Sequence, residues 1–343
     1  MVKTAVVILN WNGKNFLEQF LPALTRFTNF PDTEIIIADN FSTDDSIDFL
    51  HQNYPSLKII NLDKNYGFTG GYNRALKKVD AKYYVLINSD IEVTENWLIP
   101  LIEVMDSDDK IAATQPKIKA YHQKNHFEYA GASGGFIDKL GYPFCRGRIL
   151  DTLEKDTGQY NDVREIFWAT GACMIIRAEL FHLLGGFDDD FFAHMEEIDL
   201  CWRLKNSGYK ILVQPQSEVF HVGGGTLPIS PFKLYLNYRN NLFLLYKNLP
   251  NGKLFPTIFK RIVLDGLSAF IYLLKLSFRN FTAVFKAHLH FYQSLKKLRL
   301  KRRELLLNLN CTNRNHKEIL KGSIVIKYFF RRKKFFSQIK ELN

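Results

Sequence analysis

The chain has 343 residues, of which 46% are hydrophobic and 24% charged, a balance that is ordinary for a globular protein with a buried core. This composition excludes disorder and collagen-like repeats for most of the chain. The four cysteines are far apart and form no C-x-x-C pair, which argues against a zinc module or a disulfide scaffold and favours a reducing compartment. The N-terminal apolar run is too short for a signal peptide, so we expect no secretion by the usual route.

The net charge of +11 hides a division between two parts of the chain. From Lys233 to the C-terminus there are 24 Lys and Arg against 4 Asp and Glu, whereas residues 1–232 hold 22 basic and 31 acidic residues. An acidic front part is therefore joined to a strongly basic tail. Such asymmetry predicts that the tail meets a polyanion, either nucleic acid or an anionic membrane surface.

The front part alternates strand and helix signals. Short runs rich in Val, Ile and Tyr predict strands at Lys3–Leu9, Glu34–Ala38, Leu57–Asn61, Tyr83–Ile87 and Ile111–Thr114. Helical patterns lie between them at Asn15–Phe27, Ser42–Gln52, Gly70–Val79 and Glu95–Met105. This alternation predicts a mostly parallel, three-layer α/β sheet. Ligands of such sheets bind beyond the carboxyl ends of the strands.

Polar residues and glycines follow four of these predicted strands. The groups are Asn10–Gly13, Asp39–Asn40, Asn65–Gly67 and Asn88–Asp90. Any one group could be only a turn or a helix cap, because Asn, Asp and Gly dominate turns. That explanation weakens when all the groups fall on the same edge of one sheet. The segment Gly67–Gly71 lacks the G-x-G-x-x-G spacing of a dinucleotide site, and no Walker A sequence is present.

The next part of the chain has two kinds of pattern. Residues 120–158 are irregular, with several glycines and aromatics, which predicts loops and short strands that line an acceptor site. After residue 167 the pattern sharpens, and Met195, Ile198 and Trp202 recur at helical spacing and predict a buried stripe. On the opposite face, Asp199 and Arg203 have the i,i+4 spacing of a structural ion pair.

Two adjacent carboxylates begin this predicted helix. Glu196 and Glu197 at a helix N-terminus could simply favour the helix dipole. They are also well placed, after an apolar stretch, to abstract a proton. His221 comes later, at a predicted strand end followed by three glycines at 223–225. A lone His is more often a core or surface residue than a ligand, but the glycines let the backbone bend sharply around it, so both roles stay open.

Six motifs in a fixed order resemble glycosyltransferase family 2. They are VVILNWNG, IIADNxSxD, NxGFxGGxN, LINSD, TGA and EEIDLxxR, and the similarity runs from about Lys3 to Pro250. Within that family, the chain is most similar to the rhamnosyltransferase-like branch that builds bacterial surface polysaccharides. The resemblance implies a GT-A fold, a nucleotide-diphospho-sugar donor (UDP- or dTDP-), a divalent cation and inversion at the anomeric carbon.

The resemblance also implies roles for single residues. Those implied in donor binding are Asn10, Asp39, Asn40, Asp44, Asn65, Gly67, Gly71, Arg74, Asn88, Ser89, Trp168 and Gly171. Asp39 would accept hydrogen bonds from the base or ribose, and Trp168 and Gly171 would wall the sugar. The metal-binding D-x-D motif of the family appears here as residues 88–90, with Asn in its first position. Asp90 and His221 would hold Mn²⁺ or Mg²⁺, and the imidazole fits Mn²⁺ more comfortably.

Inversion needs one base that deprotonates the acceptor hydroxyl as it attacks. The family supplies this base from the second residue of a Glu-Asp pair, and Glu197 occupies that position here. We favour Glu197 as the base, with Glu196 and Asp199 binding the acceptor or holding the loop. Glu196 remains the alternative base.

The charge division suggests domain boundaries. We expect a catalytic domain at residues 1–232, with a nucleotide-sugar half at about 1–118 and an acceptor half at about 119–232, and a basic, aromatic-rich helical tail at 233–343. In the tail, Ile262–Phe278 is too short and polar for a membrane span and fits an in-plane amphipathic helix. Tyr328–Phe336 joins four consecutive cations to aromatic flanks, a pattern that suits anionic lipid headgroups.

This pattern predicts a cytoplasmic protein, peripheral on the inner face of the plasma membrane. A solvated helical bundle packed on the catalytic domain is the alternative for the tail. Nucleic acid is a poor partner, because no groove-reading module is recognisable.

The leading hypothesis is therefore a glycosyltransferase that acts on a lipid-linked glycan acceptor. A nucleotidyltransferase would be expected to carry a glycine-rich, basic loop after the first strand, which the sequence lacks. A non-catalytic carbohydrate-binding scaffold on the same fold is the third class. Retention of Asp39, Asp90, Glu197 and His221 together argues against that loss of activity.

Overall fold

The computed structural model describes residues 2–223, 230–308 and 315–342. The strands of its larger sheet are β1 Val2–Asn10, β2 Thr33–Asp39, β3 Lys58–Asn61, β4 Ala81–Ile87, β5 Ile91–Val93, β6 Ile111–Ala120, β7 Gln123–Phe127, β12 Arg164–Glu165, β13 Cys173–Arg177 and β14 Lys210–His221. A smaller sheet holds β8 Gly135–Asp138, β9 Pro143–Cys145, β10 Arg148–Ile149, β11 Thr152–Leu153 and β15 Ile319–Leu320. The helices are α1 Lys14–Phe27, α2 Ser46–Asn53, α3 Gly67–Leu76, α4 Ile99–Ser107, α5 Ala178–Leu183, α6 Glu196–Asn206, α7 Pro231–Asn248, α8 Asn251–Leu274, α9 Phe278–Asn308 and α10 Ile324–Phe329.

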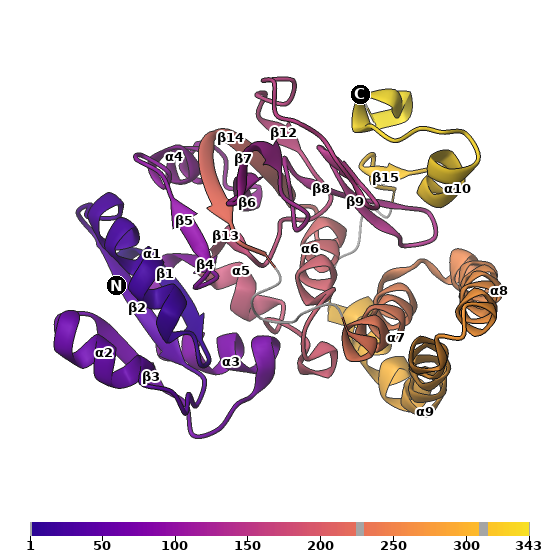
Figure 1. Ribbon diagram of the computed structural model, residues 1–343, viewed down its shortest axis with the longest axis horizontal. Coiled ribbons are helices and arrows are strands. Elements are labelled where there is room, and N and C mark those ends of the chain that lie inside the picture. Colours follow the sequence, from indigo (N-terminus) through magenta and orange to yellow (C-terminus); the bar gives the residue numbers. More distant parts are fainter. Residues whose placement is uncertain (1, 224–229, 309–314, 343) are drawn as a thin grey trace.

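The larger sheet lies between two layers of helices (Figure 1). Alternate residues of β1 face opposite cores: Ala5 and Val7 pack with α3, α5 and α6, whereas Val6 and Ile8 pack with α1, α2 and α4. Strands buried on both faces read as continuous apolar runs, which is why β1 and β4 carry so few polar residues. The predicted three-layer α/β fold is confirmed.

The strand order of the larger sheet is β12-β14-β6-β13-β4-β1-β2-β3, with β5 paired to β14 and β7 to β6. The strands β3, β2, β1 and β4 run parallel, as the sequence predicts. Beyond β4 the sheet is mixed, because β13 inserts antiparallel between β4 and β6. This insertion brings the start of β13 beside the end of β4, with Cys173 opposite Ile87.

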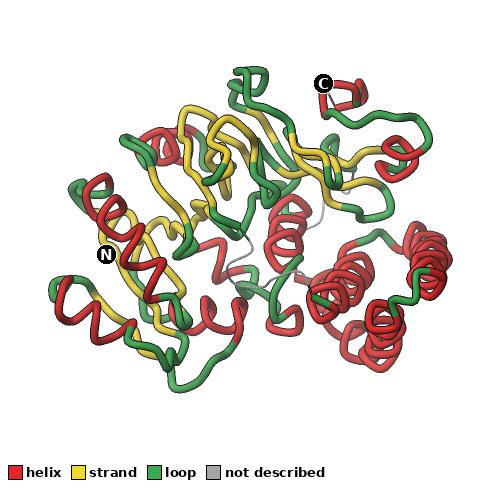
Figure 2. Tube along the Cα trace, in the orientation of Figure 1, coloured by secondary structure: helices red, strands yellow, loops and turns green. Residues whose placement is uncertain are grey.

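The chain after residue 232 falls into two different parts (Figure 2). Helices α7, α8 and α9 form a group beside α6, and most of their contacts are with one another. The last described segment, residues 315–342, returns to the smaller sheet, where β15 pairs in parallel with β8. No helix in the described part of the chain is long and apolar enough to cross a membrane.

The returning segment is built into the core. The ring of Phe336 is fully buried and lies 5.0 Å from that of Phe136, and the Phe336 amide donates to Glu154 Oε1 at 2.8 Å. The amide of Ile324 donates to the buried carboxylate of Asp138 at 2.9 Å. The tail expected at residues 233–343 is therefore not a purely helical appendage, since its end completes the sheet of the expected acceptor half. Charge composition could not reveal this, because β15 has only two residues.

Candidate active site

The parallel strands β1 and β2 place their last residues side by side, with Asn10 opposite Asp39. Both side chains are buried, and Asn10 Nδ2 donates to Asp39 Oδ1 at 3.0 Å. The turn after β2 closes on the same carboxylate, since the Ser42 amide donates to Asp39 Oδ2 at 2.9 Å and its hydroxyl to Oδ1 at 2.6 Å. Gly13 completes this edge, because a Cβ there would lie 2.5 Å from Asn10 Oδ1 and 3.5 Å from the Ser89 hydroxyl.

A second group of amides shapes the turn before α3. Asn40 Nδ2 donates to Asn65 Oδ1 at 3.0 Å and to the carbonyl of Gly67 at 3.1 Å. Gly67 has a φ of +69°, and any Cβ there would lie 2.6 Å from the ring of Phe192. Gly71 lets α3 approach β1, since a Cβ would lie 2.8 Å from Leu9. The sequence therefore brings the ends of β1 and β2 and the start of α3 together as predicted.

Asp44 and Arg74 lie at the margins of this edge. Asp44 accepts hydrogen bonds from the Lys14 and Ser46 amides, both at 3.1 Å. Burial alone would raise the pKa of Asp44, but hydrogen bonds from Ser46 and Lys14 outweigh it and lower the pKa. The guanidinium of Arg74 lies 3.6 Å from the ring centre of Tyr66 and 3.3 Å from Asp189, so it is held over the turn before α3.

The antiparallel pairing of β14 with β5 brings His221 to Asp90. His221 lies opposite Ile91, and its Nε2 is 3.3 Å from Asp90 Oδ1. On the other side of the ring, Nδ1 is 3.2 Å from Glu128 Oε2. Burial by itself would lower the pKa of His221, but its contacts with the two carboxylates raise the pKa to about 10.

The segment 88–90 is tied to the next strand. Asn88 and Ser89 are half-buried, and the Asn88 amide donates to the carbonyl of Ala172 at 2.9 Å. Gly171 precedes that residue, and a Cβ there would lie 3.2 Å from Phe68 and 3.9 Å from Glu197 Cβ. These contacts join the end of β4, the start of α3 and the start of α6 around Gly171.

The carboxylates of Glu196 and Glu197 begin α6. In each, Oε2 is buried without a hydrogen-bond partner. Burial raises the pKa of Glu197 to about 7, against the opposing effect of backbone hydrogen bonds. Burial, followed by the charge of Glu197, raises the pKa of Glu196 well above its usual range. Two carboxyl groups with raised pKa values, one of them near neutrality, are suited to proton transfer.

Two residues with implied roles face elsewhere. Asp199 is fully buried and bonds Arg203 Nε and Lys247 Nζ, both at 2.9 Å, which forms the structural ion pair that the spacing allowed. The ring of Trp168 is only 4% exposed, lies against Gly135 and donates to the carbonyl of Phe136 at 3.0 Å. Because the Asp199 carboxylate is occupied and the Trp168 ring is covered, neither enters the function proposed below.

The structure also brings in residues that the sequence reasoning missed. Ser42 belongs to the motif IIADNxSxD, but the sequence assigns it no role. Glu128 lies in the irregular stretch at residues 120–158, where no pattern distinguishes one carboxylate from another. His194 is half-buried and its Nε2 is a buried atom without a hydrogen-bond partner; desolvation, assisted by the charge of Lys233, lowers the pKa of His194 to about 4. The residues at 224 and 225, expected to bend the chain around His221, lie outside the described residues. Within the described ranges, no three His, Cys, Asp or Glu side chains are arranged to hold a metal ion by themselves.

Comparisons with known proteins place the chain. Residues 5–185 match the family model of glycosyl transferase family 2. N-acetylglucosaminyl-diphospho-decaprenol L-rhamnosyltransferase of Mycobacterium tuberculosis is 26% identical over 234 residues, which cover 63% of this chain and 75% of that enzyme. The chain spans only 17% of another relative, the O-antigen biosynthesis protein RfbC of Myxococcus xanthus, with 24% identity over 64% of this chain.

Solved structures share the fold. The Staphylococcus aureus TarS fragment in complex with UDP-GlcNAc has a TM-score of 0.56 at 15% identity, covering 97% of this chain and 93% of that one. A mannosyltransferase from Pyrobaculum calidifontis in complex with GDP-Man and Mn²⁺ has a TM-score of 0.51 at 13% identity, covering 90% and 86%. The fold is thus that of GT-A glycosyltransferases, and the chain belongs to glycosyl transferase family 2. Within the family it falls in the rhamnosyltransferase-like branch.

Proposed function

We propose that this chain is an inverting, metal-dependent glycosyltransferase of cell-surface glycan biosynthesis. It transfers a sugar from a nucleotide-diphospho-sugar to a hydroxyl of a lipid-linked glycan. One observation carries the proposal: acidic side chains lie at three places around the carboxyl ends of the strands. These are the Asp39 carboxylate with its amide neighbours, the Asp90–His221 pair, and the Glu197 carboxylate.

The donor nucleoside is proposed to bind along the ends of β1 and β2. Asp39 is fixed by Asn10 and Ser42 and can still accept hydrogen bonds from a base or ribose. The turn at residues 65–71 forms the adjoining wall, and a helix N-terminus next to it favours an anionic phosphate. TarS and the mannosyltransferase bind UDP-GlcNAc and GDP-Man. We propose a UDP- or dTDP-sugar here, and the relatedness to an L-rhamnosyltransferase makes rhamnose the first sugar to test.

Asp90 and His221 fit a divalent cation. Asp90 Oδ1 is buried 3.3 Å from His221 Nε2, and Glu128 on the far side of the imidazole can hold Nδ1–H, so a cation that displaces the Nε2 proton would have both atoms as ligands. A carboxylate with an imidazole suits Mn²⁺, whereas Mg²⁺ prefers oxygen alone. When bound, such a cation supplies positive charge next to the leaving diphosphate.

Glu197 is proposed to take the proton of the acceptor hydroxyl. A pKa near 7 leaves this carboxylate ionised in about half of the molecules at neutral pH and makes it a stronger base than an exposed glutamate. The lack of a side chain at Gly171 lets the backbone there pack closely against Phe68 and Glu197, since a Cβ would lie 3.2 Å from Phe68 and 3.9 Å from Glu197 Cβ. Glu196, whose pKa is raised by burial and by the charge of Glu197, can donate a hydrogen bond to the acceptor when it is protonated.

Donor hydrolysis and transfer test this proposal. Purified protein is incubated with UDP-, dTDP- and GDP-sugars, with and without Mn²⁺, and the released nucleoside diphosphate is measured. A glycosyltransferase releases the diphosphate from one donor class in the presence of Mn²⁺. A carbohydrate-binding scaffold leaves every donor intact, and a nucleotidyltransferase releases pyrophosphate from a nucleoside triphosphate and a sugar phosphate instead.

The helical group is proposed to rest on the cytoplasmic face of the plasma membrane. Helix α8 has an inverted surface: Phe255, Phe259, Val263, Leu267 and Phe270 recur at three- and four-residue spacing and are 54–78% exposed. Its buried side carries charges instead, with Arg261 Nη2 3.1 Å from Asp265 Oδ1. A soluble helix normally turns its apolar stripe inward.

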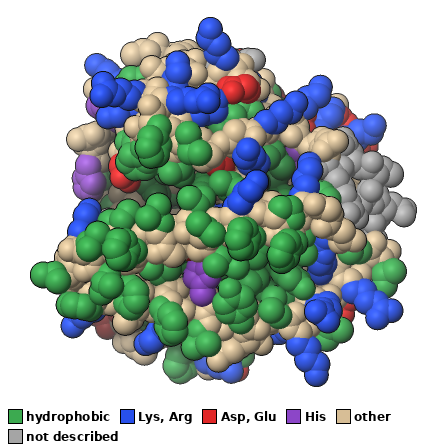
Figure 3. Space-filling view, turned by 90° about the vertical axis from the view of Figure 1, so that its right-hand side faces the viewer, with side chains coloured by type: hydrophobic (Ala, Val, Ile, Leu, Met, Phe, Trp, Pro, Cys, Tyr) green, Lys and Arg blue, Asp and Glu red, His purple; other side chains and the backbone are tan. Residues whose placement is uncertain are grey.

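Cations surround this apolar stripe. The exposed cations are Lys253 and Lys260 in the first half of α8, and Lys275 and Arg279 just beyond its end. Figure 3 shows this side of the molecule, where hydrophobic side chains gather across the lower part and Lys and Arg lie around them. An apolar stripe edged by cations is complementary to an anionic lipid surface. The stripe on α8 therefore carries the membrane proposal better than residues 328–336, where Phe336 is in the core.

A further inference from the structure

The loop that leads to the proposed base has an unusual backbone. Phe192, His194 and Met195 have φ values of +64°, +67° and +72°, in the left-handed region that side-chain-bearing residues rarely adopt. Met195 is the N-cap of α6, so the loop ends where Glu196 and Glu197 begin. A run of such residues persists only where the surroundings hold it, and such runs cluster at active sites. Residues outside the loop must therefore hold its backbone in this conformation.

Asn240 of α7 holds the loop from one side, and the amides of Phe68 and Thr69 in α3 hold it from another by donating to the Phe192 carbonyl at 3.2 and 3.3 Å. The side chain of Asn240 is fully buried, and Nδ2 donates to the carbonyls of Phe191 at 2.9 Å and of Ala193 and His194, both at 2.8 Å. The two N–H groups of one amide therefore reach three backbone oxygens that a left-handed loop leaves without helical or strand partners, so one N–H is shared between two of them. No other side-chain type of this size offers two donors and one acceptor on a planar group.

Arg239 fixes the orientation of that amide. Its Nε and Nη2 donate to Asn240 Oδ1 at 2.9 and 2.8 Å, so Nδ2 points at the loop. Nη2 also donates to the carbonyls of Asp190 and Phe191 at 2.9 and 3.1 Å. The adjacent side chains of Arg239 and Asn240 thus bind four backbone carbonyls of the loop at residues 190–195.

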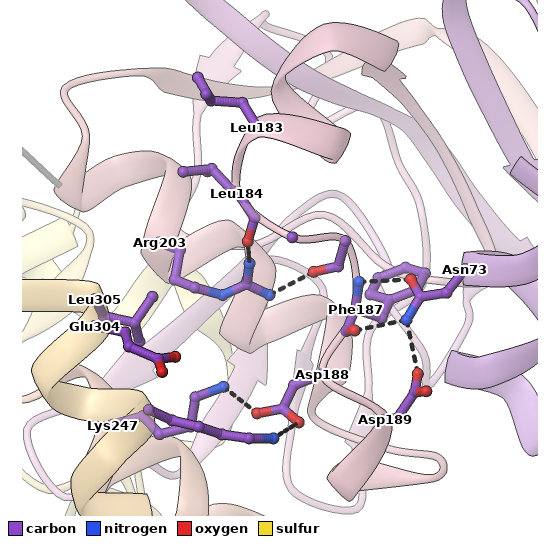
Figure 4. Close-up of a pocket in the computed structure, with 13 residues that line it drawn as sticks. Asn73, Leu183, Leu184, Phe187, Asp188, Asp189, Arg203, Lys247, Glu304 and Leu305 are labelled. Atoms are coloured by element: carbon purple, nitrogen blue, oxygen red, sulfur yellow. Dashed lines mark hydrogen bonds and ion pairs between the residues drawn. The ribbon is translucent and has the colours of Figure 1, made fainter. Parts of the chain in front are cut away.

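A second contact from α7 lies two turns further on. Lys247 Nζ and Asn248 Nδ2 donate to the two oxygens of Asp199 at 2.9 and 2.8 Å, and Lys247 also bonds Asp188 at 2.6 Å. Residues seven or eight apart lie on one face of a helix, so the same side of α7 holds the loop and the first turns of α6. Figure 4 shows Lys247 and Asp188 at the edge of a cavity of about 450 Å³ between α6, α7 and α9.

We propose that Asn240, oriented by Arg239, is a positioning residue for the catalytic base Glu197. This inference rests on the proposed function and adds to it, because Asn240 lies beyond both the catalytic domain expected at residues 1–232 and the matched residues 5–185. Glu197 lies two residues after Met195, so a relaxed loop displaces the base from the acceptor hydroxyl. The strand-end residues that bind donor are untouched by α7.

The test compares two neighbouring asparagines. Asn240→Ala removes the loop contact, whereas Asn241→Ala removes an equally buried amide that donates to the carbonyl of Gly141 at 2.6 Å, away from the loop. With the full chain and the donor that wild type uses, Asn240→Ala should lower kcat on the order of 100-fold, the effect of about 1 Å of misplacement. Its affinity for UDP with Mn²⁺ should fall by much less than kcat, because the loop meets the donor side at the start of α3, where Phe68 and Thr69 bond Phe192, and not at Asn10, Asp39 or Asp90. Asn241→Ala should keep wild-type kcat despite a similar loss of stability.

Hydrogen exchange gives a readout that does not need turnover. Amides of residues 190–197 should exchange faster in Asn240→Ala than in Asn241→Ala, while those of β1 and β2 stay protected. Equal kcat and equal exchange in the two variants would overturn the proposal. If Asn240→Ala does not fold, Arg239→Lys, which keeps the charge but loses the fork, should show the same pattern more weakly. If the wild-type protein transfers no sugar from any donor, the proposed function is refuted. The hydrogen-exchange comparison would still decide whether Asn240 holds the loop.

Discussion

The donor edge (Asn10, Asp39 and Ser42) and the base loop (residues 190–195) are held together in different ways. At the donor edge, Asn10, Asp39 and Ser42 bond one another within 32 residues of chain, and parallel strand pairing already sets their positions. The base loop has no strand to fix it, and its carbonyls are bound by side chains of α7 that come 46 to 49 residues later. One part of an active site can thus be positioned by the pairing of strands and another by a helix that comes later in the chain. Only positioning by strands leaves a compact motif in the sequence.

The largest expected effect falls on the base side. Glu197→Gln keeps the shape of the side chain but cannot take a proton, so kcat should fall by about 10²–10⁴-fold. The affinity for UDP with Mn²⁺ should be unchanged, because glutamine keeps the shape of the side chain that packs next to Gly171. Steady-state kinetics with the donor found in the panel and calorimetric titration of UDP measure the two quantities.

Glu196→Gln is the matched control for that variant. It should cost less than Glu197→Gln and act mainly through the KM of the acceptor. The reverse ranking would move the base by one residue. Near-wild-type kcat in both variants would show that neither carboxylate is the base.

The next effect concerns the C-terminal segment. Phe336→Ala should lower the free energy of unfolding by about 3–5 kcal/mol, as expected for a buried aromatic ring in a packed core. Phe330→Ala should change it by less than about 0.5 kcal/mol, because that ring is 82% exposed. Urea denaturation of the full chain provides both values. Equal stability of the two variants would mean that residues 315–342 are not part of the core.

A smaller effect is expected at the membrane face. Phe255→Ser combined with Phe259→Ser should weaken binding to vesicles of equal parts phosphatidylcholine and phosphatidylglycerol by about 100-fold. The reason is that burying each ring in the bilayer contributes up to about 1.5–3 kcal/mol of binding free energy. Val163→Ser combined with Leu183→Ser, which removes exposed apolar side chains elsewhere, should leave binding as in wild type. Sedimentation with the vesicles measures this. Comparable binding by the two double variants would remove α8 from the membrane proposal.

The smallest effect is on pH dependence. Because a base acts only as the carboxylate, and burial raises the pKa of Glu197 to about 7, kcat/KM should be level above that pH and fall as pH decreases through it. The decrease should approach about tenfold per pH unit. Initial rates of wild type across this range test the claim, and the residual activity of Glu197→Gln should lack the same step. A wild-type profile without a decrease near neutrality would contradict the role of Glu197.

Much of the donor edge could be predicted from the sequence. The strands β1, β2 and β4 are predictable because each is an apolar run followed by polar residues. Their parallel pairing then brings Asn10, Asp39 and Asp90 to one edge of the sheet. His221 was placed correctly at a strand end because β14 finishes with it. Its contact with Asp90 could not be read, since that depends on the antiparallel pairing of β14 with β5.

Helix α6 shows why the rest was not accessible. Its sequence predicts one buried stripe and one polar face, yet Glu196, Asp199 and Arg203 are buried too. Helix α7 and the loop at 184–186 cover the polar face, with Arg203 donating to two backbone carbonyls there. Partners that lie far along the chain override the local amphipathic pattern. For the same reason, no short motif marked Asn240 or Glu128.

The central claim is that the strand edge binds a nucleoside diphosphate through a divalent cation, and calorimetry tests it most directly. UDP, dTDP and GDP are titrated in turn into wild type and Asp90→Asn, with and without Mn²⁺. We predict that Mn²⁺ strengthens the binding of at least one of them to wild type, by more than about tenfold, and that Asp90→Asn abolishes this gain while leaving the fold intact. Equal affinity of wild type for all three with and without Mn²⁺, or an undiminished gain in Asp90→Asn, would contradict the account.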